Sequence, residues 1–342
     1  MKKVILFAAV VAAMMTGCAK DDNAPAANDA NAINFRVIGN KGKATSTETA
    51  DFNNFKVWGV WDEDGTGTTL NAGFMENQYV EKDGAAWDYS PAKYWPTLGD
   101  VSFYAYSPSS TLNATYAPAT QILGYVNPTE FKLQEDLLVA SALDQVKAAT
   151  PVTLPFSHAL TQFVFRVKGA VDGLIYKVEQ IDFLNINSEA DFDYAAAEWG
   201  NFATLEDYPA LDELSPVAVA YTASTDALDW TQVTSDAGYN ALMLIPGSWV
   251  SPAAGIVRDP ALLVPGESYI AFKFSVKDNA GFEYNTNSDN GTVYIPIILP
   301  TVDETTLDTR VVYEIELGDD LEAIEFTATL EGIDEVSSDY KF

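Results

Sequence analysis

The sequence contains one cysteine and one histidine in 342 residues, which excludes most chemistry that depends on these side chains. A disulfide framework needs pairs of cysteines, and zinc sites and cysteine proteases need cysteines or histidines in set patterns. The sequence also has no glycine-rich phosphate loop, no G-x-S-x-G elbow and no H-E-x-x-H helix. We therefore expect a protein that is not an enzyme and that holds no cofactor and no metal ion.

Basic residues are scarce as well. The chain has 19 lysines and arginines against 49 aspartates and glutamates, so its formal net charge is -30. Because binding to a phosphate backbone needs clustered cations, this balance argues against a nucleic-acid partner. With 48% hydrophobic residues the chain is too apolar for the disordered class, and its length predicts two domains of ordinary size.

The first residues have the pattern of a secretory signal. Lys2 and Lys3 precede an apolar run of twelve residues, which is shorter than the roughly 20 residues that a membrane-spanning helix needs. The run leads into M-T-G-C, which resembles the lipobox of bacterial lipoproteins and would place a lipid on Cys18. We expect residues 1–17 to be a lipoprotein signal peptide and residues 18–32 to be a flexible acidic tether. The lipid would then be the only contact with the membrane.

From residue 33 onward, apolar residues recur at every second position and almost no stretch has a helical period. Residues 311–317 and 324–331 both alternate in this way, and the short segment GDDLEA between them predicts a hairpin. Turn-forming clusters such as residues 62–65 punctuate the other runs. The pattern predicts an all-β protein built of antiparallel sandwiches. The other expected strands include residues 55–61, 101–106, 163–167 and 269–276.

One segment has the composition of a helix. Residues 136–148 (DLLVASALDQVKA) lie just before Pro151 and Pro155, and two prolines so close together predict a connection between domains. We therefore divide the body of the chain into an N-terminal β-sandwich domain, residues 33–155, and a C-terminal β-sandwich domain, residues 156–342.

The remaining candidates for a site have ordinary structural interpretations. His158 begins a strongly apolar strand, which predicts a packed, hydrogen-bonded histidine and not a general base. Residues 62–65 lack the twelve-residue pattern of a calcium loop. A glycoside hydrolase would need a pair of carboxylates, and nothing in the sequence singles out such a pair. In a sandwich most tryptophans belong to the core. The seven tryptophans are Trp58, Trp61, Trp87, Trp95, Trp199, Trp230 and Trp249.

Several segments, taken together, carry a family resemblance. They are the lipobox at Cys18, INFRVIG at residues 33–39, FKVWGVW, the aromatic run at residues 74–108, PFSHALTQFVFRV, and residues 181–194. The strongest block lies in the aromatic run and consists of Trp87, Tyr94, Trp95, Pro96, Phe103 and Tyr106. This combination resembles the fimbrillin family, the subunits of lipoprotein-derived type V pili.

The resemblance implies a fold and a history of processing. Fimbrillins have two transthyretin-like antiparallel β-sandwich domains in tandem, so the block above would be aromatic core. They are exported as lipoproteins, with palmitate on the lipidated cysteine, to the outer membrane and the cell surface. A trypsin-like protease then removes the lipid and the first strand. Here the removed strand would be residues 33–38, and the cut would follow Lys41 or Lys43.

The resemblance also implies partners. The C-terminal strand of the next subunit would fill the groove that trimming opens, by pairing with the exposed edge. From the residues alone, the segment 324–331 either is donated in this way or closes the protein's own sheet. If it closes the sheet, the chain fits a tip or a non-polymerising role better than a stalk. The implied partners are other fimbrial subunits, of the same or the tip and anchor kinds, and a host or glycan receptor, with the fimbrium as the final location. The donated side chains would be Ile324, Phe326, Ala328 and Leu330.

A second class of function is a monomeric, surface-exposed glycan-binding lipoprotein. In such a protein, exposed aromatic rings stack on sugars. This interpretation requires accessible tryptophans, and it predicts saturable quenching of tryptophan fluorescence by oligosaccharides without formation of fibres.

Overall fold

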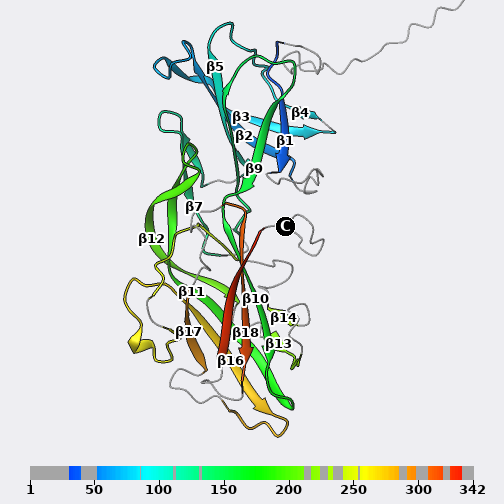
Figure 1. Cartoon of the computed structure of the whole chain (residues 1–342), viewed down its shortest axis with the longest axis vertical. Coiled ribbons are helices and arrows are strands. Elements are labelled where there is room, and N and C mark those ends of the chain that lie inside the picture. Colours follow the sequence, from blue (N-terminus) through cyan, green and yellow to red (C-terminus); the bar gives the residue numbers. More distant parts are fainter. Residues whose placement is uncertain are drawn as a thin grey trace, which may run out of the picture.

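The computed structural model has an elongated shape, with the N-terminal strands at one end and the strands after residue 160 toward the other (Figure 1). Among the residues that it describes, no helix is long and apolar enough to cross a membrane. The described residues are 31–39, 52–84, 86–110, 113–130, 133–211, 217–223, 230–233, 242–252, 255–284, 291–297, 307–318 and, for the backbone alone, 324–332.

Seven strands from the first half of the chain form one sheet, the N-terminal sheet, with the order β1-β9-β8-β5-β2-β3-β4. Neighbouring strands are antiparallel, except that β1 and β9 are parallel. The sheet curls, so that the rings of Phe35 and Tyr89 from its two edges lie 5.7 Å apart. Its strands are β1 (Phe35–Gly39), β2 (Asn54–Asp62), β3 (Leu70–Asp83), β4 (Ala86–Asp88), β5 (Asp100–Ser107), β8 (Leu138–Gln145) and β9 (Val152–His158).

Two further sheets form the rest of the molecule. In the β10 sheet the order is β14-β10-β18-β19, and β15 also pairs with β10; in the β11 sheet the order is β17-β16-β11-β7-β6, and β12 and β13 also pair with β11. The first has β10 (Thr161–Gly169), β14 (Thr231–Val233), β15 (Leu242–Leu244), β18 (Thr309–Leu317) and β19 (Ile324–Gly332). The second has β6 (Thr115–Ala117), β7 (Ile122–Val126), β11 (Leu174–Asp193), β12 (Glu198–Leu211), β13 (Val217–Val219), β16 (Tyr269–Asp278) and β17 (Thr292–Pro296). A 3₁₀ helix, η3 (Pro260–Leu262), precedes β16.

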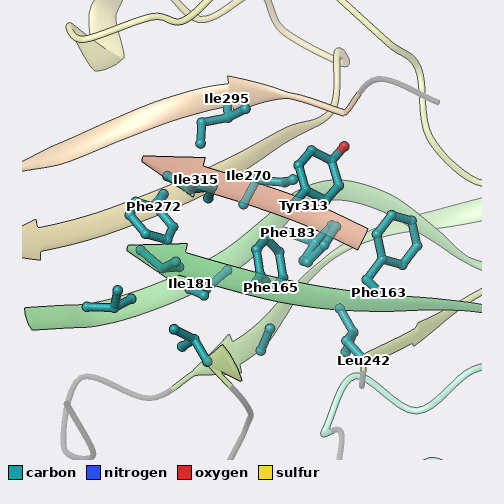
Figure 2. Packing of buried hydrophobic residues seen from close by; sticks show 14 of the residues in the cluster. Phe163, Phe165, Ile181, Phe183, Leu242, Ile270, Phe272, Ile295, Tyr313 and Ile315 are labelled. Carbon is teal, nitrogen blue, oxygen red and sulfur yellow. The ribbon is translucent and has the colours of Figure 1, made fainter. Parts of the chain in front are cut away.

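The β10 and β11 sheets pack face to face as a sandwich. Phe163 and Phe165 of β10 point toward Phe183 of β11, with ring centroids 5.0 and 5.9 Å apart (Figure 2). Tyr313 of β18 stacks on Phe165 at 5.5 Å. Because side chains alternate along a strand, every second residue of each sheet enters this core, as the period-two sequence pattern predicts.

Strands β2 and β5 are buried on both faces, which explains their nearly continuous apolar runs. Phe55 of β2 and Phe103 of β5 belong to the core of the N-terminal sheet. Trp58 and Tyr104 face the other way and pack against residues from β7, β11 and the start of β12. The Tyr194 hydroxyl, just after β11, donates to the Ala105 carbonyl at 2.8 Å. A second apolar cluster therefore joins the N-terminal sheet to the ends of β7, β11 and β12.

The prediction of an all-β protein is confirmed. The predicted hairpin is confirmed too, because β18 and β19 pair in antiparallel fashion from Leu317 opposite Ile324 to Thr309 opposite Gly332. The two-domain division at residue 155 stays a prediction. In the structure β6 and β7 pair with β11, which follows them by about fifty residues in the chain.

The helix predicted over residues 136–148 is wrong, because residues 138–145 form β8. This strand lies between β5 and β9 and is buried on both faces: Val139 packs in the second cluster, and Ala140 and Ala142 pack in the core of the N-terminal sheet. Alanine and leucine favour helices in isolation, but burial between two strands outweighs that preference, which amounts to less than about 1 kcal/mol per residue.

Gly99 lies where the chain before β5 touches the end of β2. Its φ of +74° is in the left-handed region, and a Cβ there would lie 1.9 Å from the Asp62 carbonyl oxygen. We expect Gly99→Ala to lower the free energy of unfolding by more than about 1 kcal/mol, because the backbone must shift. The loss is measured by urea denaturation. Gly84→Ala is the control, since Gly84 has a φ of +62° but no atom within 4 Å of the added Cβ. Equal losses in the two variants would contradict the steric explanation.

Candidate functional site

The first strand, β1, lies at an edge of the N-terminal sheet. It pairs in parallel with β9, from Phe35 opposite Val152 to Gly39 opposite Phe156, and no other described strand pairs with it. The chain just before β1 is also held, because Ile33 N–H donates to the Lys93 carbonyl at 2.9 Å. One backbone ladder therefore attaches β1 to the sheet, and its removal would expose the unpaired edge of β9.

The side chains of β1 and of the residues before it complete the core of the N-terminal sheet. Ile33 is fully buried and Phe35 is 4% exposed. The Phe35 ring makes edge contacts with Phe55 at 5.9 Å and with Phe103 at 5.4 Å. Between them, Asn34 is half-buried, whereas the following Arg36 is exposed. The segment is thus an apolar insert with a polar outer face.

Tyr89 ties the backbone of this segment to the opposite edge of the sheet. Its hydroxyl donates to the Ile33 carbonyl at 2.7 Å. Burial raises the pKa of the Tyr89 phenol well above its ordinary value, so the group stays protonated and remains a donor. Without the first strand, this buried hydroxyl would lose the acceptor at Ile33. The Lys93 carbonyl, 3.5 Å from the hydroxyl, would then be the other acceptor. Any strand that replaces β1 gains by presenting a closer carbonyl, because a net hydrogen bond contributes about 0.5–1.5 kcal/mol.

The C-terminal strand β19 is also an edge strand. It pairs with β18, and in the described residues no further strand pairs with it on its other side. In this structure, therefore, residues 324–332 close the protein's own β10 sheet. Their attachment, like that of β1, is a single backbone ladder.

The two edge strands share an I-x-F pattern, which also occurs at residues 181–183 and 270–272. Residues 33–37 read INFRV, and residues 324–328 read IEFTA. Both have isoleucine, then phenylalanine, then a smaller apolar residue at alternate positions, with polar residues between them. This I-x-F repeat was visible in the sequence. Its meaning depends on the structure, which places Ile33 and Phe35 in the core.

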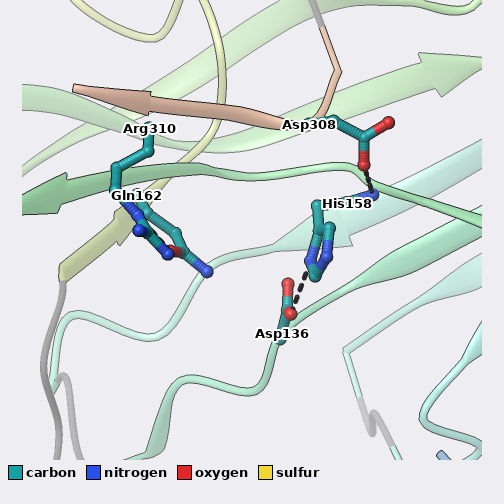
Figure 3. Close-up of polar contacts among 5 residues, drawn as sticks. All are labelled: Asp136, His158, Gln162, Asp308 and Arg310. Carbon is teal, nitrogen blue, oxygen red and sulfur yellow. Dashed lines mark hydrogen bonds and ion pairs between the residues drawn. The ribbon is translucent and has the colours of Figure 1, made fainter. Parts of the chain in front are cut away.

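His158 lies at the end of β9, where the chain passes from the N-terminal sheet to the β10 sheet. Its Nδ1 is 2.6 Å from a carboxylate oxygen of Asp136, and its backbone N–H donates to Asp308 at 2.7 Å (Figure 3). Nearby, the Arg310 guanidinium donates to the buried Gln162 amide oxygen at 3.2 and 3.1 Å. The prediction of a packed, hydrogen-bonded histidine is confirmed.

The tryptophans lie in the core or are half-buried. Trp58, Trp87, Trp199 and Trp249 are buried, and none of the seven belongs to the exposed class. Within the predicted aromatic block, Phe103 is fully buried, but Tyr94 is 51% exposed, so the prediction of core burial is wrong for Tyr94. The Tyr94 backbone bridges to Ala32 at the start of the first strand.

The other predicted site residues lie partly outside the described residues. Cys18, Lys41 and Lys43 are all in undescribed segments. For Ile324, Phe326, Ala328 and Leu330 the structure gives the backbone, which places them on β19. Among described residues, no group of three or more His, Cys, Asp or Glu side chains is placed to hold a metal ion.

These features define a class of strand-rich protein with an apolar first strand at a sheet edge and a similar strand at the opposite end of the sequence. The comparison with family models agrees, since the fimbrillin-like model matches residues 42–332. The chain belongs to the fimbrillin-like family.

The chain is similar to several solved structures, and the first of those below shares its fold. A fimbrial protein from Bacteroides vulgatus is 17% identical, with a TM-score of 0.62, over 89% of this chain and all of that one. A fimbrilin from Porphyromonas gingivalis is 10% identical, with a TM-score of 0.43, over 88% of this chain and 97% of that one. The tip fimbrial protein Mfa3 from the same organism is 11% identical, with a TM-score of 0.40, over 82% of this chain and 94% of that one. No curated protein matches the sequence.

Proposed function

We propose that this chain is a structural subunit of a cell-surface fimbrium that is exported as a lipoprotein on Cys18 and assembles by donor-strand exchange. A protease cuts after Lys41 or Lys43 and removes the lipid together with β1. The C-terminal strand of a neighbouring subunit then leaves its place beside β18 and takes the place of β1. The role is assembly and adhesion, not catalysis.

The observation that carries the proposal is the position of β1. It is an edge strand on a single parallel ladder, yet Ile33 and Phe35 fill the core of the N-terminal sheet. Cutting the chain after β1 leaves that ladder and these apolar contacts as the main attachment of the segment. Once the segment leaves, the sheet has an unpaired edge and an aromatic pocket, and both favour the addition of a strand with apolar residues at alternate positions.

The C-terminal strand has the residues that this pocket requires. Aligning IEFTA on INFRV places Ile324 where Ile33 lies, Phe326 where Phe35 lies and Ala328 where Val37 lies. In this register the donated strand runs parallel to β9, as β1 does. The polar residues between them, Glu325 and Thr327, then take the outward positions of Asn34 and Arg36.

The processing step is tested on the protein that begins at Cys18 and carries no lipid, incubated with a trypsin-like protease. We expect one new N-terminus after Lys41 or Lys43, followed by SDS-resistant ladders. The double variant Lys41→Gln/Lys43→Gln should stay uncut and monomeric. The control is Arg36→Gln, which should be cut and assemble like wild type, because Arg36 lies within the paired β1 and donates to Thr153 at 2.8 Å. Ladders from the uncut double variant would contradict the proposal.

We favour assembly over the alternative of a monomeric glycan-binding lipoprotein. That alternative requires accessible tryptophans, and none of the seven tryptophans is in the exposed class. Saturable quenching of tryptophan fluorescence by oligosaccharides, in a protein that the protease does not convert into polymers, would support the alternative.

A further inference from the structure

The residues that precede β1 pair with a second segment of the chain. The Trp95 N–H donates to the Asn31 carbonyl, and the Ile33 N–H donates to the Lys93 carbonyl, both at 2.9 Å. Between these two bonds the backbones form an antiparallel bridge. Strand β1 itself pairs with β9 alone among the described strands. The first strand is therefore held along two different backbones, by one segment at its start and by β9 further along.

Two side chains strengthen this pairing. The buried Tyr89 donates from its hydroxyl to the Ile33 carbonyl at 2.7 Å. The Lys147 ammonium donates to the side-chain oxygen of Asn31. Lys147 follows β8 and is exposed, so a strand that begins at this position meets a cation at the surface. We call the backbone of residues 93–95, Tyr89 and Lys147 together the leading clamp.

The sequence that the leading clamp holds recurs once in the chain, around the start of β19. Residues 31–35 read NAINF and residues 322–326 read EAIEF, and the pattern A-I-x-F occurs nowhere else in the sequence. In the first strand the shared residues are the buried ones, since Ala32, Ile33 and Phe35 are at most 4% exposed. The likeness therefore keeps the side chains that the sheet encloses and changes the two polar positions.

Both polar differences replace an amide with a carboxylate. Glu322 aligns with Asn31, and Glu325 aligns with Asn34. The Asn31 side chain is the one that accepts from Lys147. A cation attracts an ionised carboxylate more strongly than a neutral amide, because two full charges then interact. The charge of the leading clamp therefore matches the C-terminal segment better than it matches the residues that the clamp holds in this structure.

We propose that the leading clamp is a second recognition site for the donor strand, in which Lys147 forms an ion pair with Glu322 of a second copy of this chain. The inference rests on the proposed donor-strand exchange, and it adds a determinant of partner choice outside the edge of β9. Residues 31–33 and residues 322–324 of the donor compete for the same backbone groups of the clamp. Since only the donor brings a carboxylate to Lys147, the ion pair favours exchange over rebinding of the removed segment.

The test measures the binding of a synthetic peptide of residues 320–333 to the protease-cut Phe326→Asp protein. This variant keeps the acceptor groove but carries a charge in its own C-terminal strand, so it is expected to bind the peptide without polymerising. We expect the Glu322→Gln peptide to bind about two- to fivefold more weakly than the wild-type peptide at low salt, the range for an exposed ion pair. The difference should disappear in about 1 M salt, which screens surface charges.

Two comparisons assign the difference to Lys147. The Glu325→Gln peptide is the matched control, because Glu325 takes the position of Asn34, whose side chain donates to the Ala32 carbonyl. This peptide should bind like wild type. In the second comparison the charges are exchanged, and the Glu322→Lys peptide should bind the cut protein that also carries Lys147→Glu nearly as tightly as the wild-type pair binds. A lysine with a merely structural role would give no such rescue.

The outcomes separate the ion pair from strand exchange itself. If the Glu322→Gln and Glu325→Gln peptides are weakened equally, or if exchanging the charges restores nothing, the ion pair is wrong while strand exchange stands. If the wild-type peptide binds no better than a peptide with Phe326→Asp, the proposed function fails, and the ion pair fails with it.

Discussion

Phe326→Asp is expected to abolish polymerisation of the protease-cut protein. In the proposed register residue 326 enters the position of Phe35, whose ring lies between those of Phe55, Phe103 and Tyr89 at 5.4 to 5.9 Å. A carboxylate in this aromatic pocket has no partner for its charge, and burying such a charge costs several kcal/mol or more. The measurement is the yield of SDS-resistant ladders after proteolysis, with electron microscopy of the product.

The matched control is Thr327→Asp. It adds the same charge one residue further along, where the alternation of a strand directs the side chain outward, in the position that Arg36 occupies in β1. We expect Thr327→Asp to polymerise at nearly the wild-type level. Fibres from Phe326→Asp, or an equal loss in both variants, would show that Phe326 does not fill the Phe35 pocket.

Phe35→Ala is expected to destabilise the uncut protein strongly and to leave the cut protein unchanged. The side chain is 4% exposed and contacts three aromatic rings, so its truncation should lower the free energy of unfolding by about 3–5 kcal/mol. Urea denaturation followed by tryptophan fluorescence reports this loss, because Trp87 and Trp95 lie in or against the same cluster. After cleavage residue 35 is gone, so polymers should form as in wild type.

Arg36→Ala serves as the control, because that side chain is exposed and surface substitutions usually change stability by less than about 0.5 kcal/mol. A loss below about 1 kcal/mol for Phe35→Ala would mean that the core tolerates an empty pocket. A difference between the variants after cleavage would mean that the segment with β1 is not released.

Much of the fold was predictable from local pattern. The alternation in residues 311–317 and 324–331 identified two strands, and the connection of six residues between them identified their antiparallel pairing, because short connections join neighbouring strands. The acidic turn at residues 62–65 was likewise readable, since Asp62 and Asp64 accept hydrogen bonds from the turn that they belong to.

Local pattern is insufficient where distant parts of the chain decide the structure. Residues 138–145 have helix-forming alanines and leucines, but two flanking strands make them β8. Residues 115–126 also depend on long-range pairing, because β6 and β7 join the β11 sheet. The second apolar cluster, which holds Trp58 and Tyr104 against β7, β11 and β12, depends on this pairing and has no local signal.

The candidate site also has one part that the sequence shows and another that only the structure shows. The apolar alternation of INFRV and of IEFTA is present in the sequence, and so is their likeness. Only the structure shows that both strands lie at sheet edges and that β1 is parallel to β9. For β1 this depends on pairing with residues more than 100 positions away, and for β19 it depends on the strand order of the β10 sheet.

The sequence by itself determined the all-β class, the family and most strands, because a period of two and turn-forming residues act over a few positions. The tertiary structure alone decided which strands are edges, which apolar runs are buried on both faces, and where the two ends of the proposed strand exchange lie. These depend on long-range pairing, whose free energy comes from burying side chains that are far apart in the chain, and no local pattern records which distant partner is chosen.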